Sequence, residues 1–329
     1  MTSRDAVLLA QLGGPERREE LEPFLYELFA DPEVLRIRPA SLRRYVARTI
    51  ARRRAPSSAA IYERIGWSPI RRLTEEQRAL LETELARRAA AAGRGVPAVH
   101  AAMVCSEPRM EGAVARIADA KIERVLLLPL YPQYSFTTTR SAETRLREAL
   151  GDRGRGIVVD TVASWYDEPG FLDAHAARIR EALERLPEPD PSKVHVLYSA
   201  HSLPRRLVEK HGDPYQAQIE KTVALVNERL GGAFRSSLAY QSKVGPVAWI
   251  GPSTQDEIAR LAREGVRQVL CVPIAFVTEH VETLYEIAIL FADVARLAGI
   301  ERFVPVGALN GHPDLVRALA DVVERRLAR

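Results

Sequence analysis

The stretch GVRQVLCVPIAF (Gly265–Phe276) repeats a pattern found earlier in the chain, in AKIERVLLLPLYPQ (Ala120–Gln133). In both segments a short apolar run reads V-L-x-x-P and contains a proline, Pro129 in the first and Pro273 in the second. An apolar run of this length, without polar alternation, is typical of a parallel strand that helices cover on both faces of its sheet. The two segments therefore predict one type of buried strand, used twice.

A second pair of similar segments supports an internal duplication. VLLAQLGGPE (Val7–Glu16) resembles VLYSAHSLPR (Val196–Arg205), with a proline at the same place in each. The interval between the paired segments is longer in the first half of the chain. We therefore expect an insertion in the first half.

Apolar runs and amphipathic stretches, such as Thr74–Ala92 and Asp256–Glu264, alternate along the whole chain. The expected strands are Val7–Leu12, Val99–Val104, Val125–Leu130, Ile157–Val162, Val194–Tyr198, Ser237–Tyr240, Val269–Ile274 and Phe303–Val304. This alternation predicts an α/β fold of two similar Rossmann-like domains, each with a four-stranded parallel sheet flanked by helices. We place the first domain at 1–163, with an inserted basic segment at about 31–70, and the second at 164–329. Within these bounds, the C-terminal helix can pack back on the first domain.

Composition narrows the class of protein. The chain has 329 residues, of which 47% are hydrophobic and 27% charged, as in soluble globular proteins. Cys105 and Cys271 lie in apolar runs and are interpreted as buried thiols of a reducing compartment. The N-terminal apolar run Ala6–Leu12 is too short for a signal peptide, and no run is long enough to span a membrane. We therefore expect a cytoplasmic protein.

The net charge of +4 conceals a strongly basic segment. Between Glu33 and Glu63 there is no acidic residue, and the segment carries eight arginines: Arg36, Arg38, Arg43, Arg44, Arg48, Arg52, Arg53 and Arg54. Basicity confined to one segment favours an anionic ligand or an anionic membrane surface over nucleic acid. A solvated arginine-rich helix is the alternative.

Two groups of titratable residues follow expected strands, where ligands bind in parallel sheets. His201 follows Val194–Tyr198 in YSAHSLP, and a histidine there can accept a proton near neutral pH. A helix that begins near Glu279 in FVTEHVETLYEI would place Glu279, Glu282 and Glu286 on one face, with His280 beside them. Their mutual repulsion favours proton or cation traffic, and a solvated acidic helix end is the alternative.

Other kinds of site lack their motifs. There is no H-E-x-x-H zinc pattern, no dinucleotide fingerprint at Gly13-Gly14, no Walker loop, and no G-x-S-x-G elbow around Ser199 or Ser202. The segment LYPQYS (Leu130–Ser135) suggests a flat apolar wall for a planar aromatic ligand, or ordinary loop packing.

Taken together, the motifs resemble those of the ferrochelatases, which insert ferrous iron into a porphyrin at the end of haem synthesis. The matching segments run in order over nearly the whole chain: LGGPE (Leu12–Glu16), RRAP (Arg53–Pro56), YERIG (Tyr62–Gly66), LPLYPQYSFTTT (Leu128–Thr139), SAHSLP (Ser199–Pro204), YQSKVGPVAWIGPST (Tyr240–Thr254), FVTEHVETLYEI (Phe276–Ile287) and LNGHP (Leu309–Pro313). The resemblance implies two similar four-stranded parallel domains, and ferrous iron and a porphyrin as substrates.

The resemblance also assigns roles to residues. It implies that His201 and Glu282 are the catalytic pair and the metal ligands, and that Glu279 and Glu286 form a proton or metal path. Whether His201 acts as a base or guides the metal is left open. The porphyrin contacts that it implies are Leu12, Arg53, Arg54, Tyr62, Ser68, Tyr134 and Ser135.

Leu12 and the two arginines carry the expectation about the substrate. Arg53 and Arg54 match the segment that meets porphyrin propionates. Leu12 favours protoporphyrin IX, because the coproporphyrin-using enzymes of Gram-positive bacteria have a tyrosine there.

Three departures from the family pattern limit the expected site. The segment Ile65–Pro69 is one residue shorter than usual, which puts the local geometry in doubt. Ala288 and Leu290 replace acidic residues, which argues against a second metal site. Phe136 stands where some relatives have a cluster cysteine, so we expect neither an iron–sulfur cluster nor another permanently bound cofactor.

As partners we expect the two substrates and a peripheral contact with an anionic membrane. We expect no binding of nucleic acid, and a protein that is a monomer or a homodimer. The alternatives are a coproporphyrin III ferrochelatase, a cobalt chelatase acting on sirohydrochlorin, a non-catalytic porphyrin or haem carrier, and an unrelated two-domain binding protein.

Overall fold

The computed structural model describes residues 2–187, 189–245 and 247–328. They divide into two compact units: residues 2–165 with residues 316–328 form unit 1, and residues within 166–315 form unit 2. Each unit contains one four-stranded sheet. We propose the two units as the two domains of the protein, with the C-terminal residues in the first.

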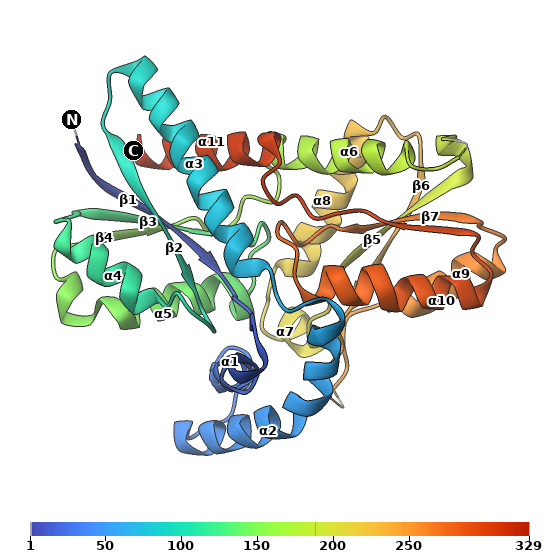
Figure 1. Ribbon diagram of the computed structural model, residues 1–329, viewed down its shortest axis with the longest axis horizontal. Coiled ribbons are helices and arrows are strands. Elements are labelled where there is room, and N and C mark those ends of the chain that lie inside the picture. The colour runs from blue at the N-terminus through green and yellow to red at the C-terminus, as the bar shows by residue number, and fades with distance from the viewer. Residues whose placement is uncertain (1, 188, 246, 329) are drawn as a thin grey trace. The chain divides into compact units, whose positions relative to one another are not determined.

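Unit 1 is built on a parallel sheet in the order β2-β1-β3-β4. Its strands are β1 (Thr2–Gln11), β2 (Val96–Met103), β3 (Arg124–Pro129) and β4 (Val158–Thr161). Its helices are α1 (Arg18–Ala30), α2 (Ala40–Arg64), α3 (Ile70–Ala92), α4 (Met110–Asp119), η1 (Phe136–Arg140), α5 (Ser141–Leu150), η2 (Gly151–Gly154) and most of α11 (Pro313–Leu327). In Figure 1, α3 and α11 lie on one face of this sheet and α4 and α5 on the other.

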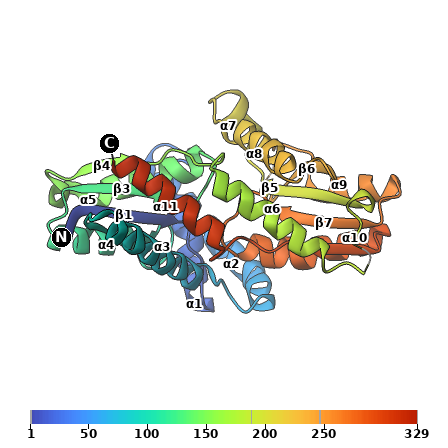
Figure 2. The ribbon, with the colours of Figure 1, turned by 90° about the horizontal axis from the view of Figure 1, so that it is seen from above.

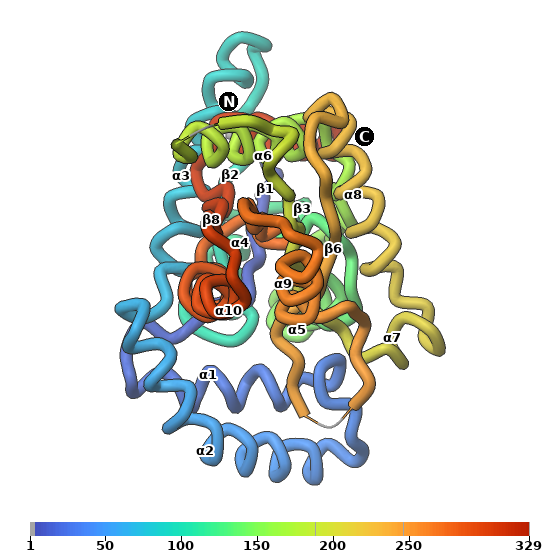
Figure 3. The backbone as a smooth tube through the Cα atoms, turned by 90° about the vertical axis from the view of Figure 1, so that its right-hand side faces the viewer, coloured from blue at the N-terminus to red at the C-terminus, as the bar shows by residue number. Residues whose placement is uncertain are grey.

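The basic insertion contains the whole of α2, which packs along α1, as Figure 3 shows. The contact uses small side chains of α2, since Ala47, Ala51 and Ala59 are buried while the arginines between them are mostly exposed. This arrangement gives α2 one face for packing and one for solvent.

Unit 2 repeats the same topology, with strands in the order β6-β5-β7-β8. Its strands are β5 (Val194–His201), β6 (Arg235–Gln241), β7 (Gln268–Pro273) and β8 (Arg302–Pro305). Its helices are α6 (Pro169–Leu183), η3 (Pro191–Lys193), α7 (Arg205–Glu209), α8 (Tyr215–Arg229), α9 (Thr254–Arg263), η4 (Glu282–Phe291) and α10 (Ala292–Ala298). Figure 2 shows β6, β5 and β7 side by side in that order.

The predicted fold class is confirmed, because both sheets are parallel, have four strands and share one strand order. The expected bounds of several strands were wrong: β1 begins at Thr2 and not at Val7, and β2 begins at Val96 and not at Val99. β5 continues past Tyr198 to His201, because Ser199, Ala200 and His201 pair with β6. Among the described residues, no helix is both long and apolar enough to cross a membrane.

Candidate active site

His201 is the last residue of β5, at the carboxyl edge of the unit 2 sheet. The residues before it on the strand are buried, whereas 37% of the His201 side chain is exposed. The strand therefore brings an imidazole from a rigid core to the edge where ligands bind in parallel sheets.

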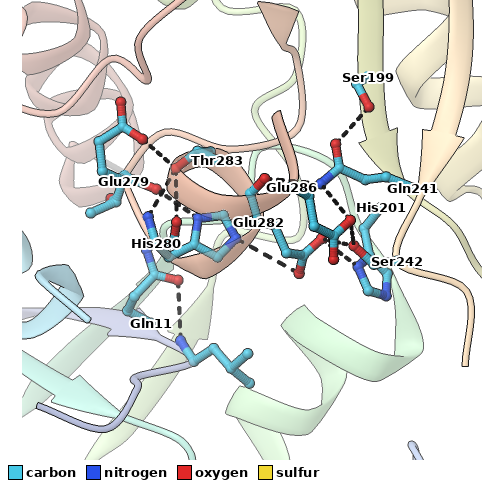
Figure 4. Close-up of polar contacts among 12 residues, drawn as sticks. Gln11, Ser199, His201, Gln241, Ser242, Glu279, His280, Glu282, Thr283 and Glu286 are labelled. Carbon is cyan, nitrogen blue, oxygen red and sulfur yellow. Dashed lines mark hydrogen bonds and ion pairs between the residues drawn. The ribbon is translucent and has the colours of Figure 1, made fainter. Parts of the chain in front are cut away.

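Glu282 faces this imidazole. Nδ1 of His201 donates to Oε2 of Glu282 at 2.8 Å, and Nε2 of His280 lies 3.7 Å from the other carboxylate oxygen (Figure 4). Within the described parts of the chain, Nε2 of His201 makes no hydrogen bond. That nitrogen is the one that can meet a proton or a metal ion.

Glu282 is also the first residue of η4, which is a π-helix and begins three residues after Glu279. The backbone N–H of Glu279 donates to Oδ1 of Asn310, and Oε1 of Glu279 accepts from the N–H of Ala308. The second carboxylate oxygen of Glu279 accepts from the hydroxyl of Thr283. Glu279 thus ties the segment before η4 to a neighbouring loop and does not join Glu282.

Glu286 lies one helical turn after Glu282 and does share a partner with it. Oγ of Ser242 lies 2.6 Å from Oε2 of Glu282 and 2.8 Å from Oε2 of Glu286. A single hydroxyl proton can serve one of these contacts fully, and a proton on Glu286 can serve the other. The structure therefore brings His201, Glu282 and Glu286 into one hydrogen-bonded group around Ser242.

The electrostatics of this group differ from residue to residue. Burial alone would lower the pKa of His201, but the facing Glu282 carboxylate outweighs burial and raises that pKa. Burial would raise the pKa of Glu282, yet the His201 charge and its hydrogen bond hold it well below its usual range. For Glu286, burial together with repulsion by Glu282 raises the pKa to about 7. A group with such a pKa exchanges protons readily at neutral pH.

Among the described residues, no group of three or more histidine, cysteine, aspartate or glutamate side chains is arranged to hold a metal ion. The assignment of metal ligands therefore depends on the pair His201 and Glu282. An imidazole nitrogen beside a carboxylate is a suitable donor set for ferrous iron.

The sequence motif LGGPE forms a tight corner after β1 in unit 1. Gly13 has φ +88°, and a Cβ there would lie 2.1 Å from Oγ of Ser106. A Cβ on Gly14 would lie 2.5 Å from Oγ of Ser68, so Ser68 packs closely against this corner. Leu12, just before the corner, is half-buried and donates its N–H to the side chain of Gln11.

The predicted porphyrin contacts on α2 have different surroundings. Arg53 is exposed, and the Arg54 guanidinium lies 5.6 Å from the centre of the Phe29 ring. Tyr62 is buried and stacks on Trp67, with ring centres 6.0 Å apart. The side chain of Tyr62, a predicted porphyrin contact, therefore already packs against Trp67 inside unit 1.

Tyr134 and Ser135 precede η1, the π-helix of unit 1. Ser135 is buried and its Oγ accepts from the N–H of Thr137, so its hydroxyl caps the helix. The Tyr134 and Phe136 rings meet edge-on, with their centres 6.0 Å apart. The Arg140 guanidinium lies 3.9 Å from the centre of the same Phe136 ring. The predicted porphyrin role of these two residues remains a prediction.

Sequence reasoning missed the residues that hold the acidic pair, above all Ser242 and Gln241. Gln241 ends β6 and Ser242 follows it, so the strand-end rule that singled out His201 applies to them too. Asn310, which holds the segment before η4, lies in the motif LNGHP, which carried the family resemblance without a role. Pro246 of the motif YQSKVGPVAWIGPST lies outside the described residues.

Comparisons with known proteins agree with the motifs. The family model described as Ferrochelatase matches residues 4–327. A protein named ferrochelatase from Synechococcus elongatus is 44% identical over 328 residues, which cover 98% of this chain and 83% of that protein. One of the same name from Gloeobacter violaceus is 44% identical over 324 residues, with 98% and 97% covered.

Solved structures share the fold at much lower identity. SirB from Bacillus subtilis with Fe3+ has a TM-score of 0.57 at 11% identity, covering 99% of this chain and 95% of that one. CbiX, titled the terminal enzyme of sirohaem biosynthesis in denitrifying bacteria, has a TM-score of 0.54 at 14% identity, with 97% and 98% covered. Since the family model spans nearly the whole chain and full-length relatives exceed 40% identity, the chain belongs to the ferrochelatase family, the enzymes that insert iron into a porphyrin.

Proposed function

We propose that the protein inserts ferrous iron into protoporphyrin IX and so forms protohaem. The observation that carries the proposal is the pair His201 and Glu282, 2.8 Å apart at the carboxyl edge of the unit 2 sheet and joined through Ser242 to Glu286. Membership of the ferrochelatase family supports the same reaction.

The chemistry requires a group that takes protons and a group that meets the metal. One ferrous ion replaces the two pyrrole N–H protons of the macrocycle, so two protons must leave. Nε2 of His201 and the Glu282 carboxylate are the groups at the site that can accept a proton or bind the ion. Glu286, with its pKa near 7, can take a proton from Glu282 through Ser242 and release it at neutral pH.

The choice of protoporphyrin IX depends on Leu12. This apolar side chain directly follows β1 and is half-buried, so it offers a nonpolar contact rather than the hydroxyl of a tyrosine. The runner-up substrate is coproporphyrin III, which carries more carboxylates.

Anaerobic turnover with ferrous iron tests the proposal, with protoporphyrin IX and coproporphyrin III as parallel substrates. We expect catalytic formation of haem, with a higher kcat/KM for protoporphyrin IX. Higher kcat/KM for coproporphyrin III would change the substrate and leave the reaction standing. Stoichiometric porphyrin binding without iron insertion would indicate a carrier instead.

We further propose that α2 contacts an anionic membrane surface. Leu42 and Tyr45 are 47% and 72% exposed, and Arg44 and Arg48 on the same helix are exposed too. Exposed apolar side chains among arginines are typical of helices that lie on anionic lipid. Sedimentation with anionic vesicles, at low and at high salt, tests this proposal.

A reducing, cytoplasmic compartment is part of the same proposal. Cys105 and Cys271 are both buried free thiols, and burial raises the pKa of each well above its usual range. Thiols held protonated in this way are poor nucleophiles and need no disulfide partner. Fractionation of the native cell, with the membrane washed at high salt, measures the location directly.

A further inference from the structure

The two carboxylates of the site are held by one hydroxyl on a neighbouring element. Ser242 follows β6, whereas Glu282 and Glu286 belong to η4. Oε2 of Glu282 receives both Nδ1 of His201 at 2.8 Å and Oγ of Ser242 at 2.6 Å (Figure 4). Ser242 therefore contacts the same oxygen that faces the imidazole.

The backbone of Ser242 is unfavourable for a serine. Its φ is +64°, in the left-handed region that disfavours residues with a Cβ and favours glycine. Gly245, three residues later, has a similar φ of +74° and is a glycine. A side chain kept in a strained conformation at a functional site indicates that the side chain itself has a role.

Gln241, the residue before Ser242, is held in place by hydrogen bonds. Its Nε2 donates to the backbone oxygen of Glu282 and to Oε2 of Glu286, both at 3.2 Å. Its Oε1 accepts from the hydroxyl of Ser199 at 2.6 Å, and both of these residues are almost completely buried. Gln241, at the end of β6, thus binds the start of η4 at the backbone of Glu282 and at the carboxylate of Glu286.

We propose that Ser242 is a positioning residue for iron insertion: its hydroxyl fixes the Glu282 carboxylate in the orientation that faces His201. This inference rests on the proposed function. A carboxylate that binds a metal needs a second hydrogen bond to select one rotamer, because otherwise it samples several orientations. Loss of such an outer partner typically lowers activity by about 10–100-fold.

The test compares Ser242→Ala, Ser242→Gly and Ser242→Thr. Alanine and glycine both remove the hydroxyl, but only glycine relaxes the left-handed backbone. Threonine keeps the hydroxyl, but its branched Cβ fits that backbone worse than serine does. If the hydroxyl positions Glu282, the variant that keeps the hydroxyl is the most active of the three. If Ser242 has only a structural role, the most stable variant is the most active.

We expect kcat for iron insertion to fall about 10–100-fold in both the alanine and the glycine variant. Porphyrin affinity, measured by fluorescence quenching, should stay within about twofold of the wild-type value. The predicted contacts of the porphyrin carboxylates, Arg53 and Arg54, do not involve this hydroxyl. The threonine variant should melt at a lower temperature than the glycine variant and yet be the more active of the two.

Lys121→Gly is the matched control for backbone strain. Lys121 has φ +55° at the end of α4 in unit 1 and is exposed. Its replacement should leave kcat unchanged, whatever it does to the melting temperature. The control therefore separates relief of strain from loss of the hydroxyl.

Two results overturn the inference while the wild type inserts iron: a glycine variant with wild-type kcat, or a glycine variant clearly more active than the alanine variant. The second result decides the matter even where the threonine variant does not fold. If the wild type inserts no iron, the proposed function itself fails and the role of Ser242 fails with it.

Discussion

At the residue scale, His201 is the group whose loss should be most specific. We expect His201→Ala to lower kcat for iron insertion by about 10²–10⁴, the usual value of a general acid–base group. Porphyrin binding should remain largely intact, because the predicted carboxylate contacts, Arg53 and Arg54, are on α2. Anaerobic iron insertion and a fluorescence titration with porphyrin measure the two effects separately.

The fold should survive this substitution, because 37% of the side chain is exposed and water can replace the imidazole. His211→Ala, at an exposed histidine of the same unit, is the control and should keep wild-type kcat. Wild-type turnover by His201→Ala would exclude the proposed role of this residue.

Glu282 and Glu279 are close in sequence but differ in their contacts. We expect Glu282→Gln to impair iron insertion far more than Glu279→Gln. The first change removes the charge that faces His201, whereas a glutamine at 279 still offers an oxygen to the N–H of Ala308. Parallel kcat measurements on the two variants decide between them, and equal, mild losses would indicate a general effect of acidic charge.

At the element scale, α2 is the part whose surface carries a prediction. We expect the double variant Arg44→Gln/Arg48→Gln to bind anionic vesicles about 30-fold more weakly at low salt, since each arginine near such a surface contributes about 1 kcal/mol. These two residues are exposed, whereas Arg43 donates to the backbone oxygens of Ala30 and Ile37. Vesicle sedimentation measures the change.

The control for the α2 variant removes the same charge elsewhere. Arg153→Gln/Arg206→Gln changes two exposed arginines outside α2 and should bind vesicles as the wild type does. If both double variants weaken binding equally, net charge and not α2 governs the contact. If neither weakens it, the arginines are a solvated face.

The elements also show where sequence reasoning succeeded and where it did not. All eight strands were expected, because a buried parallel strand is a short apolar run with a clear pattern in the sequence, as in β7 (Gln268–Pro273). The π-helical form of η4 was missed, because the apolar pattern of FVTEHVETLYEI fits an α-helix as well as a π-helix. The bond from the N–H of Glu279 to Asn310, which holds the segment before η4, joins residues distant in sequence and was missed as well.

The candidate site divides in the same way. His201 and Glu282 could be predicted because a strand end and a family motif mark them. The role of Ser242 could not, because it depends on φ +64° and on the approach of η4 to β6. Neither feature has a local sequence signature.

At the scale of the whole molecule, the two units share one topology but not one chemistry. A π-helix follows the third strand of each sheet in chain order, η1 after β3 and η4 after β7. η4 begins with Glu282 and carries Glu286, whereas η1 (Phe136–Arg140) has threonines and an arginine. Of the two similar units, only the η4 segment of unit 2 therefore carries the pair of carboxylates that share a hydroxyl, Glu282 and Glu286.

We expect two buried histidines of unit 2 to lower the stability of the protein in acid. Burial, reinforced by the nearby His312, lowers the pKa of His175 to about 3, and burial lowers the pKa of His195 to about 4. Above pH 6.5 both are neutral in the folded and unfolded chain. As the pH falls below 6.5, only the unfolded chain binds these protons, so each histidine lowers the free energy of unfolding by up to about 1.4 kcal/mol per pH unit.

His175→Leu tests this linkage at one position. The ring is 1% exposed, packs edge-on against Phe171, and has no hydrogen-bond partner for Nε2 among the described residues, so leucine leaves no polar group unsatisfied. We expect stability at pH 7 to change by less than about 1.5 kcal/mol. Between pH 6 and pH 4, the loss of stability should be shallower than in the wild type by about 1.4 kcal/mol per pH unit. Urea titrations at each pH, followed by circular dichroism, measure the slope. An identical slope for His175→Leu and the wild type would mean that His175 is already protonated in the folded chain, in spite of its burial.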